Sequence, residues 1–333
     1  MVRKPQVSIG MPVYNGEQYV QVSIESILNQ TFQDFKLIIS DNASTDRTQE
    51  ICQKYADQDN RISYHRNIEN IGGPSNYNRV FELSSSKYFK WAAYDDVLAP
   101  EFLRKCVNVL DNDPSIILCH SKTGRIDKDG NLLDYYNRGM LKRISSPRPH
   151  ERFGDLITRC YTTCPIFGVF RTNSLAKTSL QGSYIGADRN LLAEIGLMGR
   201  IYQIPECLFF WRDHPDSYTS IFYGSYSNQM ATLDPNRLRM ETSWWSKQDS
   251  TSFTHWKNCI EYLRSVNRVS LSLFEKLLCD AQIFRWFARE GWLLMGMDVE
   301  IFLLKSSPFA RKFIPFIMSN LRRTVLSINQ KKR

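Results

Sequence analysis

The most constraining feature of this sequence is a regular alternation of short β-rich runs and helical patterns between Val7 and His120. Runs of β-branched and other apolar residues predict strands, and the amphipathic stretches between them predict helices. The expected strands are residues 7–11, 35–40, 62–65, 87–93 and 116–120, and the expected helices are residues 17–29, 44–55, 75–84 and 100–111. Elements that alternate in this way form a parallel sheet with helices on both faces, so we expect an α/β fold.

Polar residues follow four of these expected strands. The segments are PVYNGE at 12–17, DNASTD at 41–46, NIENIGG at 67–73 and YDD at 94–96. In the second segment, Ser44 or Thr45 is the expected cap of the next helix, with Asp46 in its first turn. Because ligands of open α/β sheets bind outside the carboxyl ends of the strands, we expect the four segments to converge on one crevice.

Three carboxylates in these segments are candidate functional groups. Asp41 ends an expected strand, where it can accept hydrogen bonds from a base or a ribose. The adjacent Asp95 and Asp96 would repel each other in a buried site unless they share a cation. One or two carboxylates together with substrate phosphates form the shell expected for Mg²⁺ or Mn²⁺, although adjacent acids are also common on exposed loops.

Further candidates lie beyond residue 120. The pair Asp129 and Gly130 predicts a tight turn between two strands. Residues 183–217 predict an amphipathic helix that begins near Asp188, then a strand followed by Arg212 and His214. A carboxylate at a helix start is usually a cap, but it can act as a general base if that helix end faces the crevice. The planar guanidinium of Arg212 suits a pyrophosphate, and His214 could complete a metal shell or contact phosphate.

The net charge of +9 is confined to the end of the chain. Residues 1–300 carry 35 basic and 34 acidic side chains, whereas residues 301–333 carry eight basic side chains and no acidic one. On a helix over residues 309–328, one side would carry Arg311, Lys312, Arg322 and Arg323, and the other Phe313, Ile314, Ile317, Leu321, Val325 and Ile328. This pattern fits a helix on an anionic membrane surface, and equally a helix packed on the protein with a solvated basic side. Nucleic-acid binding is less well supported, because no recognised module accompanies the tail.

The sequence also bears on the compartment. The eight cysteines form no CxxC pair, which favours reduced core thiols. The first residues have no apolar signal core, and no apolar run approaches the roughly 20 residues of a spanning helix. We expect a cytoplasmic protein, which the basic tail could attach to the cytoplasmic face of a membrane.

Four sequence blocks, taken together, resemble one protein family. They are VSIGMPVYNGEQYVQVSIESILNQTFQDFKLIISDNASTDRTQEI, NIGGPSNYNRVF, KWAAYDDVLAPEFL, and the GADRNLLAEIGLMGR segment that leads to RDHPDS. The blocks cover about residues 7–220 in the family's order, and they resemble the family-two glycosyltransferases of the GT-A fold.

The resemblance implies a role for each motif residue. Nucleotide-sugar contacts would come from Pro12, Tyr14, Glu17, Asp41, Asn70, Gly72, Asn78, Asp95 and Arg212. The metal, Mn²⁺ or Mg²⁺, would be held by Asp95, Asp96 and His214. Asp188 would be the catalytic base that deprotonates the acceptor hydroxyl. One position departs from the pattern, because many relatives have Asp where this chain has Ala93.

The expected organisation follows from the same resemblance. Residues 1–228 would form a GT-A catalytic domain, with a mostly parallel sheet, a nucleotide-binding half at 1–120 and an acceptor half at 121–228. Residues 229–333 would form a helical C-terminal region with the basic amphipathic tail. The implied activity is metal-dependent, inverting transfer of a sugar from a nucleotide-sugar donor, most plausibly UDP-linked, to a glycan or lipid-linked acceptor in surface polysaccharide synthesis.

Two other functions stay open at this point. Sugar nucleotidyltransferases share a similar α/β layout, but they are disfavoured because PVYNGE is not a Gly-rich phosphate loop with a Lys. A non-catalytic scaffold that binds a nucleotide sugar or a glycan is the second alternative, and Ala93 is its support in the sequence.

Overall fold

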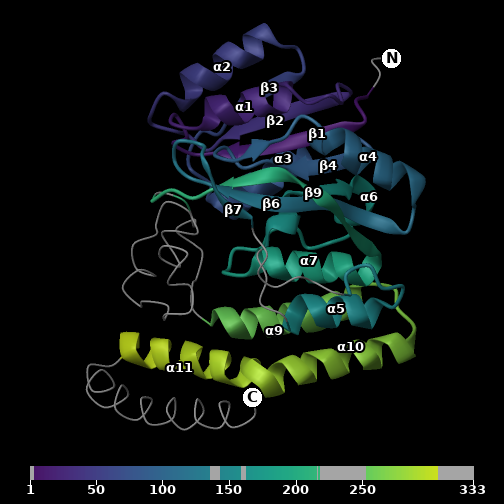
Figure 1. Cartoon of the computed structure of the whole chain (residues 1–333). Helices are drawn as coiled ribbons and strands as arrows, with labels where there is room; N and C mark the ends of the chain where they lie inside the picture. Colours follow the sequence, from purple (N-terminus) through teal and green to yellow (C-terminus); the bar gives the residue numbers. More distant parts are fainter. Residues whose placement is uncertain (1–3, 136–142, 159–162, 216, 218–252, 307–333) are drawn as a thin grey trace.

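The computed structural model describes residues 4–135, 143–158, 163–215, 217 and 253–306 (Figure 1). The strands of this part form one nine-stranded sheet in the order β3-β2-β1-β4-β8-β6-β9-β5, with β7 paired to β6. The strands are β1 (Val7–Val13), β2 (Phe35–Asp41), β3 (Ile62–Arg66), β4 (Tyr88–Trp91), β5 (Val97–Leu98), β6 (Ile116–Ile126), β7 (Leu132–Tyr135), β8 (Val169–Arg171) and β9 (Arg200–Arg212).

The first half of the sheet confirms the expected parallel arrangement. Strands β1 to β4 are neighbours in parallel register, with Val13 of β1 opposite Asp41 of β2 and Asp41 opposite Arg66 of β3. The connecting helices are α1 (Val20–Leu28), α2 (Thr48–Gln58), α3 (Gly73–Glu82) and α4 (Phe102–Asn112). The carboxyl ends of β1, β2 and β3 therefore lie side by side, and the loops that follow them meet.

The second half of the sheet is mixed. Strand β8 lies antiparallel between β4 and β6, whereas β6 and β9 run parallel to each other over most of their length. Of the eight strand pairings in the described residues, four are parallel and four are antiparallel. The expected turn at Asp129 and Gly130 joins the antiparallel strands β6 and β7, and Gly130 adopts a left-handed φ of 92°.

Helices cover the sheet and continue into a separate layer (Figure 1). They are α5 (Pro149–Thr158), a 3-10 turn (Cys164–Phe167), α6 (Thr172–Leu175), α7 (Ala187–Met198), α9 (Thr254–Arg268), α10 (Leu273–Trp286), a π-helical turn (Phe287–Gly291) and α11 (Trp292–Ser306). Helix α7 lies next to the sheet, α9 and α5 lie beyond it, and α10 and α11 run end to end as the outermost layer. No helix in the described ranges is long and apolar enough to cross a membrane.

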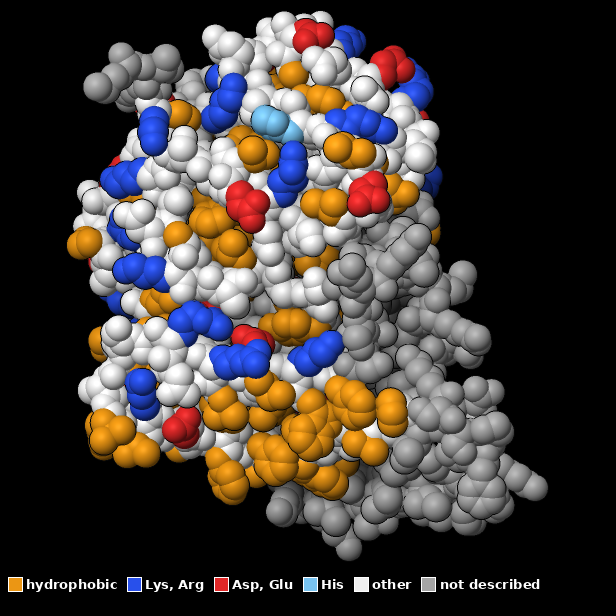
Figure 2. All heavy atoms as spheres, turned by 180° about the vertical axis from the view of Figure 1, so that it is seen from behind, with side chains coloured by type: hydrophobic (Ala, Val, Ile, Leu, Met, Phe, Trp, Pro, Cys, Tyr) orange, Lys and Arg blue, Asp and Glu red, His pale blue; other side chains and the backbone are white. Residues whose placement is uncertain are grey.

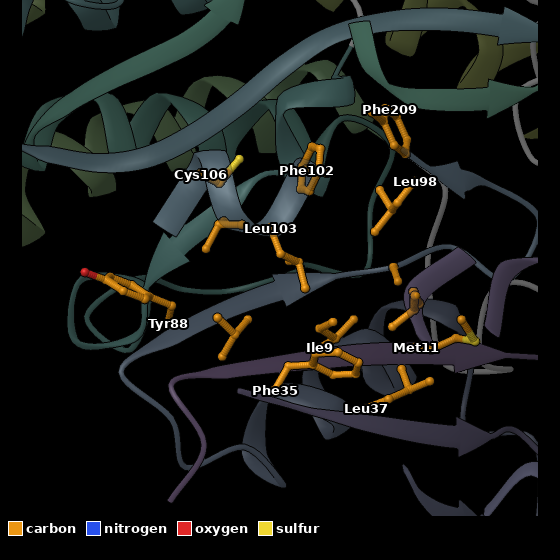
Figure 3. Packing of buried hydrophobic residues seen from close by; sticks show 14 of the residues in the cluster. Ile9, Met11, Phe35, Leu37, Tyr88, Leu98, Phe102, Leu103, Cys106 and Phe209 are labelled. Atoms are coloured by element: carbon orange, nitrogen blue, oxygen red, sulfur yellow. The ribbon is translucent and has the colours of Figure 1, made fainter. Parts of the chain in front are cut away.

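Two hydrophobic clusters hold these layers together, one on each face of the sheet. In the first, Ile9, Met11, Phe35 and Leu37 of the parallel strands face Phe102 and Leu103 of α4 (Figure 3). The second joins Phe89 and Trp91 of β4 to α5, α7, α9 and α10. Alternate residues of β4 thus enter opposite clusters, as the two-residue period of a strand requires. The boundaries expected at residues 120 and 228 remain predictions, and the basic tail lies outside the described residues.

Candidate active site

The loops after β1 and β2 are joined by hydrogen bonds between side chains and backbone. The amide of Asn15 donates to Ser44 Oγ at 2.9 Å, and the amide of Thr45 donates to Asn15 Oδ1 at 2.8 Å. The amide of Glu17 donates to Asp46 Oδ2 at 3.0 Å. Asn15 has a left-handed φ of 50°, a conformation that Asn tolerates well. The two motif loops therefore form one rigid platform beside the expected crevice.

This platform corrects one local expectation. Ser44 and Thr45 bind the neighbouring loop and do not cap α2, which begins at Thr48. Instead, Asp46 Oδ1 accepts a hydrogen bond from the Thr48 amide at 3.0 Å. Two further motif residues flank the platform: Pro12 is buried within β1, and Tyr14 is half-buried just beyond it.

Asp41 is completely buried at the end of β2. Its Oδ2 accepts hydrogen bonds from the Tyr64 hydroxyl at 2.6 Å and from Arg66 Nη1 at 2.7 Å, and its Oδ1 accepts one from the Ser44 amide at 2.8 Å. Burial and this carboxylate together raise the pKa of the Tyr64 phenol. The carboxylate thus fastens the ends of β2 and β3 to the following loop, and its predicted contact with a nucleotide stays a prediction.

A network of amide side chains orders the loop between β3 and α3. Asn42 Nδ2 donates to Asn70 Oδ1 at 2.8 Å, and Asn70 Oδ1 also accepts from the Gly72 amide at 2.9 Å. Asn67 Nδ2 donates to Asn42 Oδ1 and to Asn76 Oδ1. Gly72 precedes α3 with a left-handed φ of 84°, which favours glycine. The predicted pocket residues Asn70 and Gly72 therefore lie in one ordered turn.

Asn78 connects α3 to a segment more than one hundred residues later. Its Nδ2 donates to the Gln181 carbonyl at 2.9 Å, and its Oδ1 accepts from the Gln181 amide at 3.0 Å. A side-chain amide that satisfies both backbone groups of one residue fixes that residue in place. Asn78 thereby holds the loop that leads to α7 and to Asp188.

The acidic pair after β4 divides into two different environments. Asp96 is 5% exposed, and its Oδ1 accepts a hydrogen bond from the Arg212 amide at 2.9 Å. Burial and the neighbouring charge of Asp95 raise the pKa of the Asp96 carboxyl well above its usual range. Asp95 is more exposed, and its Oδ2 lies 2.9 Å from Nε2 of the buried His214. The two adjacent carboxylates thus have separate partners from the end of β9.

Arg212 is buried and is committed to the chain itself. Its Nε donates to the Asp95 carbonyl at 2.8 Å, and its Nη1 donates to the carbonyls of Asp127 and Lys128. The guanidinium lies over the ring of Tyr19, 4.8 Å from its centroid. These contacts hold the loop at residues 94–96 against the turn between β6 and β7. The predicted contact of Arg212 with a diphosphate stays a prediction.

The donor atoms at this point fit a divalent ion that other ligands complete. Asp96 Oδ2 and His214 Nδ1 are buried without a hydrogen-bond partner in the described structure, which is costly for polar atoms. Asp95 Oδ2 and His214 Nε2 are close enough to bind one ion in place of a shared proton. In the described ranges, no three His, Cys, Asp or Glu side chains form a complete metal site. An ion here would need substrate oxygens or water, as is usual for Mg²⁺.

Asp188 lies in the first turn of α7. The helix begins after Gly186, whose left-handed φ of 88° permits the sharp entry, so the cap position carries no side chain. Asp188 Oδ1 accepts a hydrogen bond from the amide of Arg189 at 2.8 Å. Helix α9 supports this entry, because Asn258 Nδ2 donates to the Ile185 carbonyl at 3.3 Å. The predicted base is therefore placed at a helix N-terminus, where the helix dipole favours a negative charge.

Tyr77 on α3 bears on two groups of carboxylates: Asp95 with Asp96 after β4, and Asp188 at the start of α7. Burial raises the pKa of its phenol, and the negative charges of Asp95, Asp96 and Asp188 raise it further. Hydrogen bonds connect α3 to the segments that carry these carboxylates: Trp91 Nε1 of β4 donates to the Tyr77 carbonyl at 2.9 Å, and the neighbouring Asn78 binds Gln181. The acidic pair after β4 and the segment that leads to Asp188 are therefore both attached to α3, although 92 positions separate Asp96 from Asp188 in the sequence.

Sequence reasoning missed several residues that shape this site. They are Tyr19, Asn42, Tyr64, Arg66, Asn67, Asn76, Tyr77 and Asn258. Arg66 ends β3, so the rule that directs attention to strand ends could have found it. The same rule covers Asn42 and Asn67, which lie in the strand-end segments 41–46 and 67–73. The remaining residues support motif residues from neighbouring elements, and no spacing in the sequence points to them.

Comparisons with known proteins agree with this fold. The family model for glycosyl transferase family 2 matches residues 8–175. A glycosyltransferase of Methanocaldococcus jannaschii is 36% identical over 132 residues, which are 39% of this chain and 46% of the relative. Chondroitin synthase of Escherichia coli is 33% identical over 39% of this chain and 19% of its own length. The chain thus spans less than half of either relative.

Solved structures show the same architecture over more of the chain. The structure of S. aureus TarS 1-349 in complex with UDP aligns with a TM-score of 0.59 and 16% identity, covering 86% of this chain and 72% of TarS 1-349. The fold is that of a glycosyltransferase of the GT-A type. With a family model that matches half of its length, this chain belongs to glycosyl transferase family 2.

Proposed function

We propose that this chain is an inverting, metal-dependent glycosyltransferase that uses a UDP-linked sugar and a glycan or lipid-linked acceptor in cell-surface polysaccharide synthesis. The observation that carries the proposal is that helix α3 is bonded to both regions: Trp91 Nε1 of β4 donates to the Tyr77 carbonyl, and Asn78 binds Gln181 in the segment before α7. Asp95 and His214, beyond β4 and β9, offer ligand atoms to a cation, and Asp188 offers a base at the N-terminus of α7. Transfer to a hydroxyl needs this combination of leaving-group and nucleophile activation.

We expect Asp188 to be the base that takes the proton from the acceptor hydroxyl. Its carboxylate accepts the proton of the acceptor hydroxyl as that oxygen attacks the anomeric carbon, and the bond to the nucleoside diphosphate breaks on the opposite side of the sugar. Attack from the side opposite the leaving group inverts the anomeric configuration.

In binding of the nucleotide-sugar donor, we expect Asp95 and Asp96 to have different roles. We expect Asp95 and His214 to bind the ion, while Asp96 is the internal support that holds the Arg212 backbone. A bound Mn²⁺ or Mg²⁺ would neutralise the departing diphosphate. The platform of Glu17 and its neighbouring loops, together with Asp41, Asn70 and Gly72, would define the nucleotide pocket. Ala93 removes one carboxylate of the family's motif, and His214 would supply a nitrogen ligand beside Asp95.

The related proteins support the proposed substrate classes. TarS 1-349 has been crystallised with UDP and with UDP-GlcNAc, and one sequence relative is named chondroitin synthase. A UDP-sugar donor and a polysaccharide acceptor are therefore the first classes to test. For the basic tail, whose residues 309–328 lie outside the described part, we propose contact with an anionic membrane surface on the cytoplasmic side.

Calorimetric titration of the purified chain with UDP-, dTDP- and GDP-sugars, with and without Mn²⁺, tests the donor side. We expect Mn²⁺-dependent binding of a UDP-sugar that is lost in the double variant Asp95→Ala/Asp96→Ala. The double variant Asp57→Ala/Asp280→Ala removes two exposed carboxylates on α2 and α10 and should bind like the native chain. Release of pyrophosphate from a sugar phosphate and a nucleoside triphosphate would instead identify a nucleotidyltransferase.

A non-catalytic scaffold is the remaining alternative, and Ala93 is the observation that favours it. A scaffold would bind the donor without hydrolysis or transfer under every metal tested. Donor hydrolysis that depends on Mn²⁺ and disappears in the Asp95→Ala/Asp96→Ala variant would exclude it. Absence of binding to every donor in the panel would count against the transferase proposal as well.

A further inference from the structure

Exposed hydrophobic side chains are concentrated on the C-terminal helices. Eighteen large hydrophobic residues of the described chain are exposed, and eleven of them lie between Trp256 and Phe302. Figure 2 shows hydrophobic side chains gathered at the end of the molecule where α10 and α11 lie in Figure 1. Large contiguous patches of this kind are rare on soluble monomers and usually mark an interaction surface.

Helix α10 carries the four most exposed of these eleven side chains, and the π-helical turn after it adds Phe287. The outer face consists of Leu273, Phe274, Leu277, Phe284 and Phe287, with exposed fractions of 76%, 68%, 59%, 71% and 39%. Residues 277 and 284 are seven apart, so they lie on one side of the helix. The opposite side, with Cys279, Ile283 and Trp286, is buried against the second hydrophobic cluster. Internal packing therefore accounts for the inner face of α10 and leaves the outer face unexplained.

We infer that this outer face of α10 docks on an anionic lipid surface. Among the described elements, the helix belongs to the outermost layer (Figure 1). The sequence after α11 begins at residue 307 and contains seven Lys or Arg residues and no Asp or Glu. A chain that combines exposed aromatic and aliphatic side chains with a polybasic segment has the two features that bind anionic membrane interfaces.

This inference extends the membrane contact proposed for the tail to a face of the described structure, and it does not depend on sugar transfer. Apolar insertion and attraction of basic residues reinforce each other, because either one alone gives only weak, reversible attachment. A second copy of the chain fits the face less well. The outer face offers five large side chains, whereas a stable dimer interface uses about 20–30 residues on each side.

The test uses full-length chains and sedimentation with vesicles of phosphatidylcholine, with or without about one third phosphatidylglycerol. The variant Phe274→Ser/Leu277→Ser/Phe284→Ser removes the outer face. The matched control, Leu132→Ser/Leu133→Ser/Tyr135→Ser, removes three exposed apolar side chains from β7. We expect the native chain and the β7 control to bind the anionic vesicles alike, and the α10 variant to bind at least about tenfold more weakly. Thermal unfolding should be unchanged, because all six side chains are exposed.

A fourth full-length chain separates the face from the tail. In it, Arg311, Lys312, Arg322 and Arg323 are replaced by Gln. If this chain alone loses binding while the α10 variant binds like the native chain, the tail proposal stands and the present inference is wrong. Absence of vesicle binding by the native chain would also refute it, as would a dimer that the α10 substitutions dissociate. Donor titration of each variant keeps these outcomes distinct from failure of the proposed transferase function.

Discussion

The strand-end loops after β1 to β3 and the acidic region near Tyr77 differ in how far their buried polar groups are paired. Around Asp41 and the platform of Asn15 and Ser44, these side chains form hydrogen bonds within the chain, although Asn67 Oδ1 in the next loop is buried without a partner in the described residues. Around Asp96 and His214, buried polar atoms have no partner in the described residues. A satisfied network is already complete, whereas unpaired buried atoms mark a place that another molecule or ion can complete.

This difference divides the motif residues into those that hold the fold together and those that are available to bind ligands or to react. Substitutions in the platform should act mainly on folding, because its hydrogen bonds connect elements of the protein. Substitutions in the acidic region should act mainly on turnover and ligand binding, because its atoms are incompletely paired. The predictions below test this division.

The largest expected effect is on turnover. Asp188→Asn keeps the size and hydrogen-bonding capacity of the side chain but removes the base, so we expect transfer to fall about a thousandfold. Donor affinity should stay within about twofold of the native value. A coupled assay for nucleoside diphosphate release and calorimetric donor titration measure the two quantities. Retained turnover would exclude Asp188 as the base.

The next effect concerns the metal and tests the division of labour between adjacent acids. We expect Asp95→Ala to weaken Mn²⁺-dependent donor binding about a hundredfold, since it removes a proposed ligand from the ion. Asp96→Asn should instead leave the Mn²⁺ dependence in place, because an amide oxygen can still accept from the Arg212 backbone. Titrations at several Mn²⁺ concentrations distinguish the two variants. If Asp96→Asn abolishes the Mn²⁺ dependence and Asp95→Ala does not, the proposed roles are reversed.

Much of the fold could be predicted from the periodicity of the sequence. The parallel strands β1 to β4, their helices and the Asp129-Gly130 turn all follow from local patterns. Local patterns also placed Asp188 at a helix start. The insertion of β8 between β4 and β6 could not be predicted, because it depends on chain crossovers and leaves no periodic signal. Strand β6 extends beyond His120 through the buried polar residues Ser121 and Thr123, where the apolar run has already ended.

The site was predictable in its residue types and less so in its contacts. The strand-end rule located Asp41, Asp95 and Asp96, because it depends only on sheet topology. It could not reveal that Arg212 donates to three backbone carbonyls or that Asn78 binds Gln181, since these partners are 84 or more residues apart in the sequence. Contacts between distant segments are created by folding, and a single sequence carries no pattern for them.

A stability measurement tests the platform side of the comparison. Asp41→Asn removes the charge that binds Arg66, which costs about 2 kcal/mol of unfolding free energy. This is less than a fully buried pair would lose, because the Arg66 side chain is 33% exposed. The control Glu50→Gln breaks the exposed pair with Arg47, which water screens, and should leave the urea midpoint unchanged. Equal urea midpoints for native, Asp41→Asn and Glu50→Gln chains would contradict the assignment of Asp41 to the scaffold.

The smallest expected effect decides between two roles for Asn78. The family resemblance implies a nucleotide contact, whereas the paired hydrogen bonds to Gln181 make Asn78 a positioning residue for the loop before Asp188. If positioning is its role, Asn78→Ala should lower kcat about tenfold and leave the donor Kd within twofold, because only the base is displaced. Ser75→Ala, an exposed change on the same helix, serves as the control. Weaker donor binding with an unchanged kcat would instead support the nucleotide contact that the family resemblance implies for Asn78.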